Sequence, residues 1–260
     1  MKISNRIALF VALAICLGCA SASATVNTSH KFADESLNFD IVYHWGLIWK
    51  HAASATLSIS NNGEYYYTSL QARTVSWADK LYRVRDTLTC KIKKDGLKPQ
   101  LYVKTSHEGK HYGKDVVKYT YVGDSSIANC TVDRKNKDTQ HISLKTQGQA
   151  YDMLSVFYYL RAIDYDQFRN VGKIHTTVFS GRKKEKLTVK YIAQESVKLR
   201  DKSVHDSYHI TFTFTQDGQA KSSDDIHCWI STDNAHIPLM IKGSVSVGEV
   251  RVYYKAPTVN

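Results

Sequence analysis

The chain has 260 residues, 43% of them hydrophobic, and its formal net charge is +11. This composition argues against a disordered chain, and the length fits one large all-β domain or two smaller domains. The positive charge is spread along the chain, which is typical of strands that carry Lys and Arg outward and so prevent aggregation of sheet edges. The alternative is an anionic partner, such as a phospholipid surface, lipopolysaccharide, an acidic glycan or nucleic acid.

Residues 1–24 have the features of a secretory signal peptide. A charged start, an apolar run and a series of small residues follow one another before Ala24. This pattern predicts export to the periplasm, cleavage after Ala24 and a single β-rich domain over residues 25–260. A lipoprotein anchored through Cys19 is the alternative, because a glycine precedes that cysteine. No later stretch is long and apolar enough to predict a transmembrane helix.

The first predicted strand covers residues 37–45, where hydrophobic side chains recur at every second position. This period marks a strand with one buried face. Gly46 permits a bend, and the chain then continues to an Asn62-Gly63 pair. Asn-Gly between alternating runs is a strong hairpin signal, so a strand is expected to return over residues 65–73. A short helical or irregular crossing follows over residues 75–82, and further strands are predicted over residues 84–94, 100–108, 114–121, 127–134 and 141–144.

Residues 151–161 are the only long segment with the features of a helix. Asp152 lies near its start and Arg161 near its end, where the helix dipole favours each charge. The side chains between them are apolar on nearly every face, which is typical of an enclosed helix. A buried strand is the alternative, because Val, Phe and Tyr favour strands.

Strands are predicted again after this helix, over residues 173–180, 185–196, 209–215, 226–231, 237–242 and 245–254. The abundance of tyrosine, with 17 residues, and the scarcity of proline, with 3, suit long paired strands. Hairpins that follow one another at short spacing indicate an antiparallel meander. We therefore expect a mainly β fold, in which about a dozen strands form a barrel, half-barrel or β-roll around one buried helix.

Three cysteines follow the leader, at Cys90, Cys130 and Cys228. In an oxidising compartment, one interpretation is a single disulfide and a spare thiol, with Cys90–Cys130 as the pair nearest in sequence; the sequence leaves the disulfide status open. Three buried thiols are the alternative, since a free cysteine behaves as a small hydrophobic residue.

The sequence gives little support for catalysis, for a metal site or for a cofactor. His205 and His209 lie in a segment with strand character, where residues four apart are about 13 Å apart. After the leader, the sequence contains no Cys-x-x-Cys or Gly-x-Ser-x-Gly spacing and no glycine-rich phosphate loop. We therefore expect no metal, no cofactor, no catalytic residue and no nucleic-acid partner, and a protein that is not an enzyme.

Several segments together resemble the bacterial exported proteins of domain-of-unknown-function family 3108. They are residues 37–55 with a Tyr-x-Trp-Gly core, Tyr-Arg-Val-Arg-Asp at 82–86, Leu-Lys-Pro at 97–99, residues 152–161, Trp-Ile-Ser-Thr-Asp at 229–233 and Ile-Pro at 237–238. The resemblance spans nearly the whole mature chain and implies a β-rich protein of the cell envelope. The family has no established activity, so no catalytic residue is implied.

Large amphipathic side chains are more numerous than a core requires, and aromatic-lined concavities often hold apolar or sugar-like ligands. The candidate ligand-binding residues are Trp45, Trp77, Tyr158, Arg161 and Trp229. The alternative is that the aromatic residues simply fill a large barrel.

Arg161 closes an otherwise apolar helix, and a buried charge needs a partner. We expect a structural ion pair with Asp233 or Asp86. Two functions fit these observations. The first is an exported envelope protein that carries a lipid-like or other apolar ligand in a barrel cavity. The second is a non-catalytic interaction or scaffold module with a packed interior, which binds envelope proteins or glycans.

Overall fold

The computed structural model describes residue 28 and residues 31–245 and 248–257. The strands before the central helix are β1 Glu35–Trp45, β2 Ile48–Asn62, β3 Tyr65–Thr74, β4 Val84–Lys93, β5 Lys98–Glu108, β6 His111–Val122, β7 Ser125–Arg134, β8 Gln140–Gln147 and β9 Ala150–Tyr151. Those after it are β10 Lys173–Phe179, β11 Lys184–Lys198, β12 Val204–Gln216, β13 Ile226–Ser231, β14 Pro238–Ser244 and β15 Glu249–Lys255. The helices are α1 Ser76–Asp79, the 3₁₀ turn η2 Asp95–Leu97, α2 Ser155–Ala162 and α3 Tyr165–Val171.

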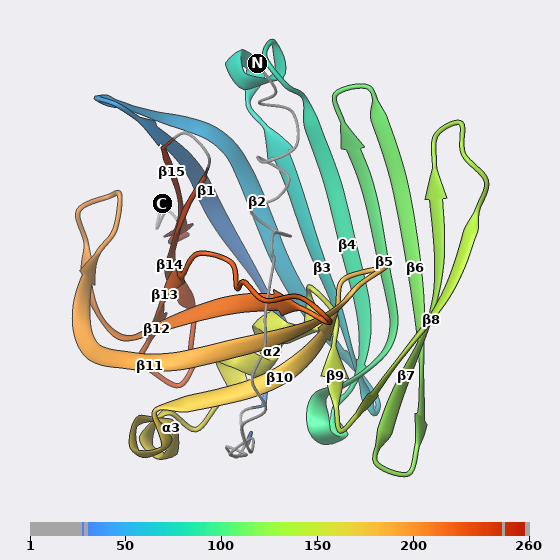
Figure 1. Cartoon of the computed structure of the whole chain (residues 1–260). Helices are drawn as coiled ribbons and strands as arrows, with labels where there is room; N and C mark the ends of the chain where they lie inside the picture. The colour runs from blue at the N-terminus through green and yellow to red at the C-terminus, as the bar shows by residue number, and fades with distance from the viewer. Residues whose placement is uncertain (1–27, 29–30, 246–247, 258–260) are drawn as a thin grey trace.

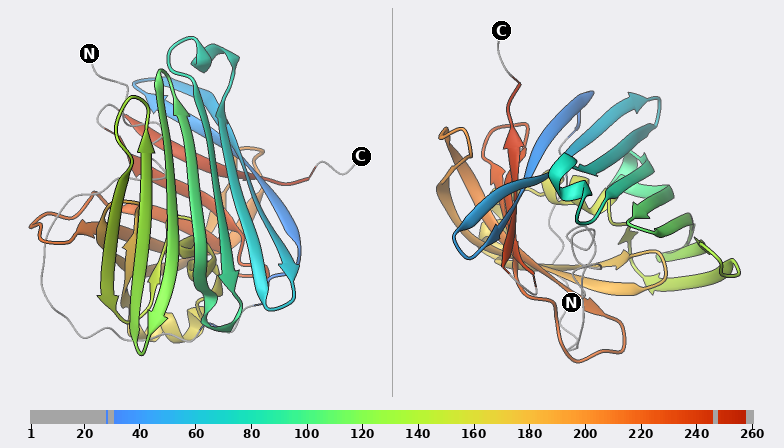
Figure 2. Two further views of the ribbon diagram at one scale, coloured as in Figure 1. Left: turned by 90° about the vertical axis from the view of Figure 1, so that its right-hand side faces the viewer. Right: turned by 90° about the horizontal axis from the view of Figure 1, so that it is seen from above.

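All these strands belong to one sheet of 15 strands that curls into a nearly closed barrel (Figures 1 and 2). Their spatial order is β8-β7-β6-β5-β4-β3-β2-β1-β15-β14-β13-β12-β11-β10-β9. Pairing is antiparallel throughout, except between the short β9 and β10. The predicted mainly β fold and its antiparallel meander are confirmed, with more strands than the dozen expected.

Local sequence sets the turns and the curvature of this sheet. Gly63 has a φ of +55° in the β2–β3 turn, a conformation that glycine adopts without steric cost. The pairing register shifts between Ile41 and Val42 in β1, and between Tyr191 and Ala193 in β11. Such irregularities bend a strand and increase its twist, which helps a long sheet to curl on itself.

Helix α2 lies inside the curve of the sheet (Figure 1) and begins later than the predicted residues 151–161. Residues 150 and 151 instead form β9, which pairs with β10. The helix starts after Asp152 because that side chain accepts hydrogen bonds from the backbone amides of Leu154 and Ser155, both at 2.8 Å. Seven of the eight residues of α2 are buried. The helix therefore packs on the inner side chains of the strands around it.

A large hydrophobic cluster fills the interior, and a smaller one lies apart from it. The smaller cluster consists of Val42, Val197, Leu199, Trp229, Leu239, Met240 and Tyr253. Trp229 therefore packs away from α2, with residues from the end of β11 and from β14.

The three cysteines are buried thiols. Cys90 on β4 pairs in register with Tyr102 on β5, Tyr102 with Val117 on β6, and Val117 with Cys130 on β7. Three strand spacings of about 4.8 Å separate the two cysteines by roughly 14 Å. A disulfide needs Cα atoms within about 7 Å, so a Cys90–Cys130 bond does not form in this sheet, and the alternative of three buried free thiols holds.

The predicted signal peptide at residues 1–24, including Cys19, lies outside the described residues. Among the residues that are described, none of the helices is long and apolar enough to cross a membrane.

Candidate functional site: an apolar cavity beside helix α2

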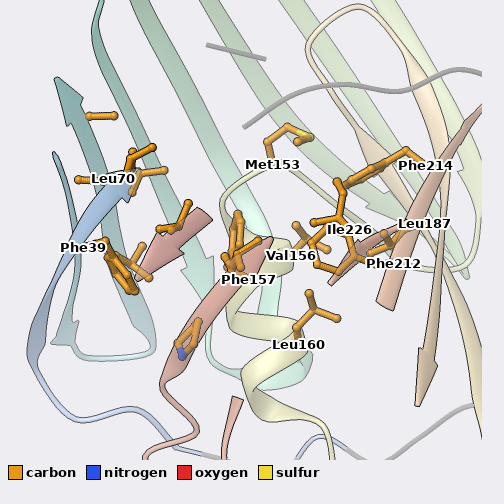
Figure 3. A pocket seen from close by; sticks show the side chains of 17 residues that line it. Phe39, Leu70, Met153, Val156, Phe157, Leu160, Leu187, Phe212, Phe214 and Ile226 are labelled. Carbon is orange, nitrogen blue, oxygen red and sulfur yellow. The ribbon is translucent and has the colours of Figure 1, made fainter. Parts of the chain in front are cut away.

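An apolar cavity of about 100 Å³ lies beside α2 (Figure 3). Figure 3 shows Val156, Phe157 and Leu160 projecting from the helix toward it, between side chains of the early strands and side chains of the late strands. Every lining residue is hydrophobic: Phe39, Ile41, Ala55, Leu57, Leu70, Ala72, Met153, Val156, Phe157, Leu160, Leu187, Phe212, Phe214, Ile226, Pro238, Ile241 and Val252.

Small side chains on two neighbouring strands help to leave this space open. Ala55 on β2 pairs with Phe39 on β1 and with Ala72 on β3. Side chains at directly paired positions lie on the same face of a sheet, so these three residues line one wall together. Because protein interiors are closely packed, a larger side chain in place of either alanine would occupy part of the cavity.

The lining side chains of the cavity include no hydrogen-bonding group. Apolar cavities of this kind stay free of water, and they hold apolar molecules by removing hydrophobic surface from water, at about 25 cal/mol per Å². The site can therefore retain an apolar group, and its walls provide no side chain for acid–base or nucleophilic chemistry.

A buried polar cluster fixes the start of α2. Asp152 is fully buried, and its carboxylate accepts hydrogen bonds from the Cys90 thiol at 3.0 Å and from the Ser155 hydroxyl at 2.8 Å, in addition to the two backbone amides. Burial raises the pKa of Asp152 above its ordinary value, and the hydrogen bonds oppose that shift. Burial also raises the pKa of the Cys90 thiol well above its usual value, so this thiol stays protonated and donates. The cluster ties the helix to β4.

A buried cation fixes the end of the helix. Arg161 is 1% exposed and forms a bidentate ion pair with Glu35, in which one of its two hydrogen bonds measures 3.1 Å. Its guanidinium also donates to the backbone carbonyls of Ala235, at 2.8 Å, and His236, at 2.9 Å. The expectation of Asp233 or Asp86 as partner was therefore wrong.

The sequence pattern does not reveal Glu35 as the partner, because 126 residues separate it from Arg161. Asp233 supports the loop that binds Arg161. Its carboxylate accepts hydrogen bonds from the Ser231 hydroxyl and from the backbone amide of Ala235, the residue whose carbonyl accepts from Arg161. Asp86 belongs to β4 and is buried there.

Comparison with known proteins supplies the family. The sequence model of DUF3108, a family described as proteins of unknown function, matches residues 38–255. The chain belongs to the DUF3108 family. The resemblance predicted from its sequence motifs is thus confirmed. A search of curated proteins found no match to this DUF3108 chain.

The fold of this DUF3108 chain has a counterpart among solved structures. It is similar to the crystal structure of a beta-barrel-like protein of domain of unknown function DUF1849 from Brucella abortus, with a TM-score of 0.58 and 11% sequence identity. The match covers 87% of this chain and 98% of the other. At this identity the likeness concerns the barrel fold alone.

The five predicted ligand-binding residues of the DUF3108 chain lie in different places. Tyr158 and Arg161 belong to α2, where the Tyr158 hydroxyl donates to the backbone carbonyl of residue 58 at 3.0 Å. Trp229 stacks on a neighbouring histidine and donates to a glutamate at 2.8 Å. Trp77 is half-buried, and Trp45 is 56% exposed. None of the five lines the cavity, and their proposed role stays a prediction.

Sequence reasoning selected large aromatic residues and missed the side chains that line the cavity. Their one visible signal is the alternation that predicts inward-facing positions, together with small residues such as Ala55 and Ala72 at those positions. Which inward-facing residues meet across the barrel depends on the tertiary structure.

Proposed function

We propose that this DUF3108 protein is exported to the cell envelope and holds a lipid-like or other apolar ligand in the cavity beside α2. The uninterrupted hydrophobic lining of that cavity carries the proposal. Export is supported by the charged, apolar and small-residue pattern of residues 1–24.

The volume of the cavity limits what it can hold. About 100 Å³ is less than the ~150 Å³ of an engineered apolar cavity that binds benzene. As described, the cavity suits a short segment of an acyl chain. A longer ligand requires displaced side chains, and Met153 is suited to this because methionine is unbranched and adapts to irregular space.

Mass spectrometry of the protein purified from its own envelope tests this function. We expect organic extraction to release an apolar molecule in a fixed ratio to the protein. Ala72→Leu, which fills the cavity, should lose that molecule, whereas Ala193→Leu, a partly exposed site on β11 that does not line the cavity, should retain it. Absence of any extracted ligand, or equal retention by both variants, would contradict the proposal.

The small volume of the cavity favours a second candidate function, a non-catalytic interaction or scaffold module. Ligand pockets usually measure about 300–1,000 Å³, which exceeds the present cavity. A protein without extractable ligand that still retained an envelope protein or glycan at moderate salt would support this module.

A further inference from the structure

The tip of the β1–β2 hairpin exposes a group of large hydrophobic side chains, which we call the apolar tip. Leu47 is 100% exposed, Trp45 56%, Ile48 52% and Trp49 47%. Other hairpins turn through polar residues, such as Gly63 and Glu64 between β2 and β3, or Gly123 and Asp124 between β6 and β7. The apolar tip therefore differs in chemistry from the turns that the rest of the sheet uses.

The apolar tip carries hydrophobic side chains on both faces of its hairpin. Trp45 pairs with Ile48, and His44 pairs with Trp49, whose ring stacks on the histidine ring at a centroid distance of 3.7 Å. Successive strand residues point to opposite faces, so Trp45 and Trp49 project on different sides. The barrel can cover only one face of a hairpin, and the exposure of both sides indicates a surface that another apolar medium covers.

Neighbouring residues hold the apolar tip in place. The Lys50 ammonium lies over the ring of Trp77 at 4.1 Å, and the Trp77 indole donates to the backbone carbonyl of His51 at 2.8 Å. On the other side, the Arg251 guanidinium lies over the ring of Trp49 at 4.5 Å. These contacts join the hairpin to α1 and to β15, so the apolar tip protrudes from a fixed base.

Basic residues lie at the same end of the barrel as the apolar tip. The β1–β2, β3–β4, β5–β6 and β7–β8 connections all lie at this end (top of Figure 1). Their exposed cations are Lys50, Lys80, Arg83, Lys110, Lys135 and Lys137. No ion pair involves these six residues in the described chain. Leu81, which is 79% exposed, adds a further hydrophobic side chain.

Carboxylates at this end offset little of the positive charge. Asp79 pairs with Arg85 at 2.6 Å, and Glu249 pairs with Arg251 at 2.5 Å. Asp138, in the β7–β8 turn, is exposed, and Glu108 and Asp133, near the ends of β5 and β7, are partly buried and form no ion pair in the described chain. The free cations therefore outnumber the free carboxylates, which makes this end complementary to an anionic surface.

We propose that the apolar tip inserts into the interfacial region of an anionic lipid bilayer, while Lys and Arg side chains at the same end of the barrel contact lipid headgroups. Tryptophan is favoured at membrane interfaces, and clustered cations are attracted to anionic leaflets. A fluid bilayer can cover both faces of a protruding hairpin, whereas a rigid groove must match its shape. This docking is independent of the ligand cavity, although it would bring the barrel close to a source of apolar molecules.

Co-sedimentation of the purified protein with vesicles tests the proposal. We expect binding to vesicles of phosphatidylglycerol mixed with phosphatidylcholine, and much weaker binding to phosphatidylcholine alone. Leu47→Ser and Leu47→Asp should each reduce binding by about tenfold or more, since each removes the most exposed hydrophobic side chain of the apolar tip. Leu47 is fully exposed, so neither variant should disturb folding, and circular dichroism checks this.

Val122→Asp is the matched control, because Val122 is 62% exposed and lies at the opposite end of the barrel. It makes the same change of charge as Leu47→Asp and should bind like the wild type. Raising salt from about 0.1 to about 1 M should weaken binding by screening the cations.

The results distinguish insertion from other occupants of the surface. Failure of the wild type to bind either vesicle overturns the proposal. So does undiminished binding of Leu47→Ser, which would mean that charge alone attracts the protein. Self-association that Leu47→Asp abolishes, without vesicle binding, would assign the apolar tip to a second copy of the chain. None of these results depends on whether the cavity holds a ligand.

Discussion

Buried carboxylates in this barrel differ in how well the protein compensates their charge. Asp152 accepts hydrogen bonds from side-chain and backbone donors at the start of α2. Asp86 on β4 is also buried, but its Oδ1 atom has no hydrogen-bond partner in the described chain. Burial raises the pKa of Asp86, and the nearby Lys104 opposes that shift. A buried and poorly paired charge is costly, so we infer that ionised Asp86 lowers the free energy of unfolding.

The first prediction concerns the pH dependence of this cost. Asp86 has a higher pKa when folded than its ordinary 3.8, so its stabilising contribution is lost as the pH rises from 3.8 through the folded value. Asp86→Asn does not titrate, and we expect it to raise the free energy of unfolding at neutral pH by roughly 1 kcal/mol. The gain should disappear below pH 3.8. Urea unfolding at a series of pH values measures both effects.

Asp79 provides the opposite case as a control. Hydrogen bonds from Arg85 and Thr74 lower the pKa of Asp79 to about 2. Its contribution is therefore fully present above its ordinary pKa of 3.8 and is lost as the pH falls through about 2. We expect Asp79→Asn to destabilise at neutral pH and to match the wild type only below pH 2. A destabilising effect of Asp86→Asn at neutral pH would contradict our assignment.

Helix α2 is the element whose position depends most on distant contacts. Its start is attached to β4 through Asp152 and Cys90, and its end is attached to β1 through Arg161 and Glu35. The sequence predicts a helix here, with Asp152 near its start and Arg161 near its end. It does not predict the partners, because they come from strands far along the chain. The helix positions one wall of the cavity, so these attachments also set the cavity's shape.

The second prediction tests the attachment at the end of α2. Arg161→Ala would leave Glu35 and two backbone carbonyls without their donor, so we expect a loss of about 3–5 kcal/mol in the free energy of unfolding. The substitution should also accelerate the exchange of amide hydrogens with solvent, and this acceleration should be larger in α2 than in β4. A double-mutant cycle with Glu35→Ala measures the coupling. Arg169→Ala is the control, because its ion pair with Asp166 is exposed and should contribute less than about 0.5 kcal/mol.

Hydrogen exchange separates a local attachment from a contribution to the whole barrel. Equal acceleration of exchange in α2 and β4 would mean that Arg161 stabilises the entire sheet and not the helix end. No loss of stability in Arg161→Ala would contradict the structural ion pair itself.

The sheet as a whole decides the chemistry of the cysteines. Sequence proximity favours Cys90–Cys130, but the meander places two strands between them. Burial raises the pKa of Cys130 to about 11 and that of Cys228 to about 12, so few thiolates exist at neutral pH. Buried thiols with raised pKa values react slowly.

The third prediction follows for the mature chain purified without reductant. A thiol reagent should label all three cysteines in denaturant and none rapidly in the native protein. Ser60→Cys, at an exposed position on β2, is the control and should add one fast-reacting thiol. Detection of a single thiol in denaturant would indicate a disulfide between two of the cysteines and would contradict the three separate thiols of this structure.

Comparison across these scales shows which features follow from local sequence. Alternation at residues 37–45 predicts β1, the Asn-Gly pair at 62–63 predicts the following hairpin, and the charges at Asp152 and Arg161 predict a helix. These signals depend on residues a few positions apart, because strand period, turn conformation and helix dipole are short-range properties. The mainly β class and the meander follow from their order along the chain.

The amino-acid sequence by itself determined nearly all the strands, the presence of the central helix, the family and the apolar character of the interior. Only the tertiary structure decided that the interior keeps a cavity, that Glu35 pairs with Arg161, and that Trp45 points to solvent with the rest of the apolar tip. Each of these features depends on side chains that the closing of the sheet brings together or leaves uncovered. Close packing in three dimensions fixes such contacts, and no local pattern of residues encodes them.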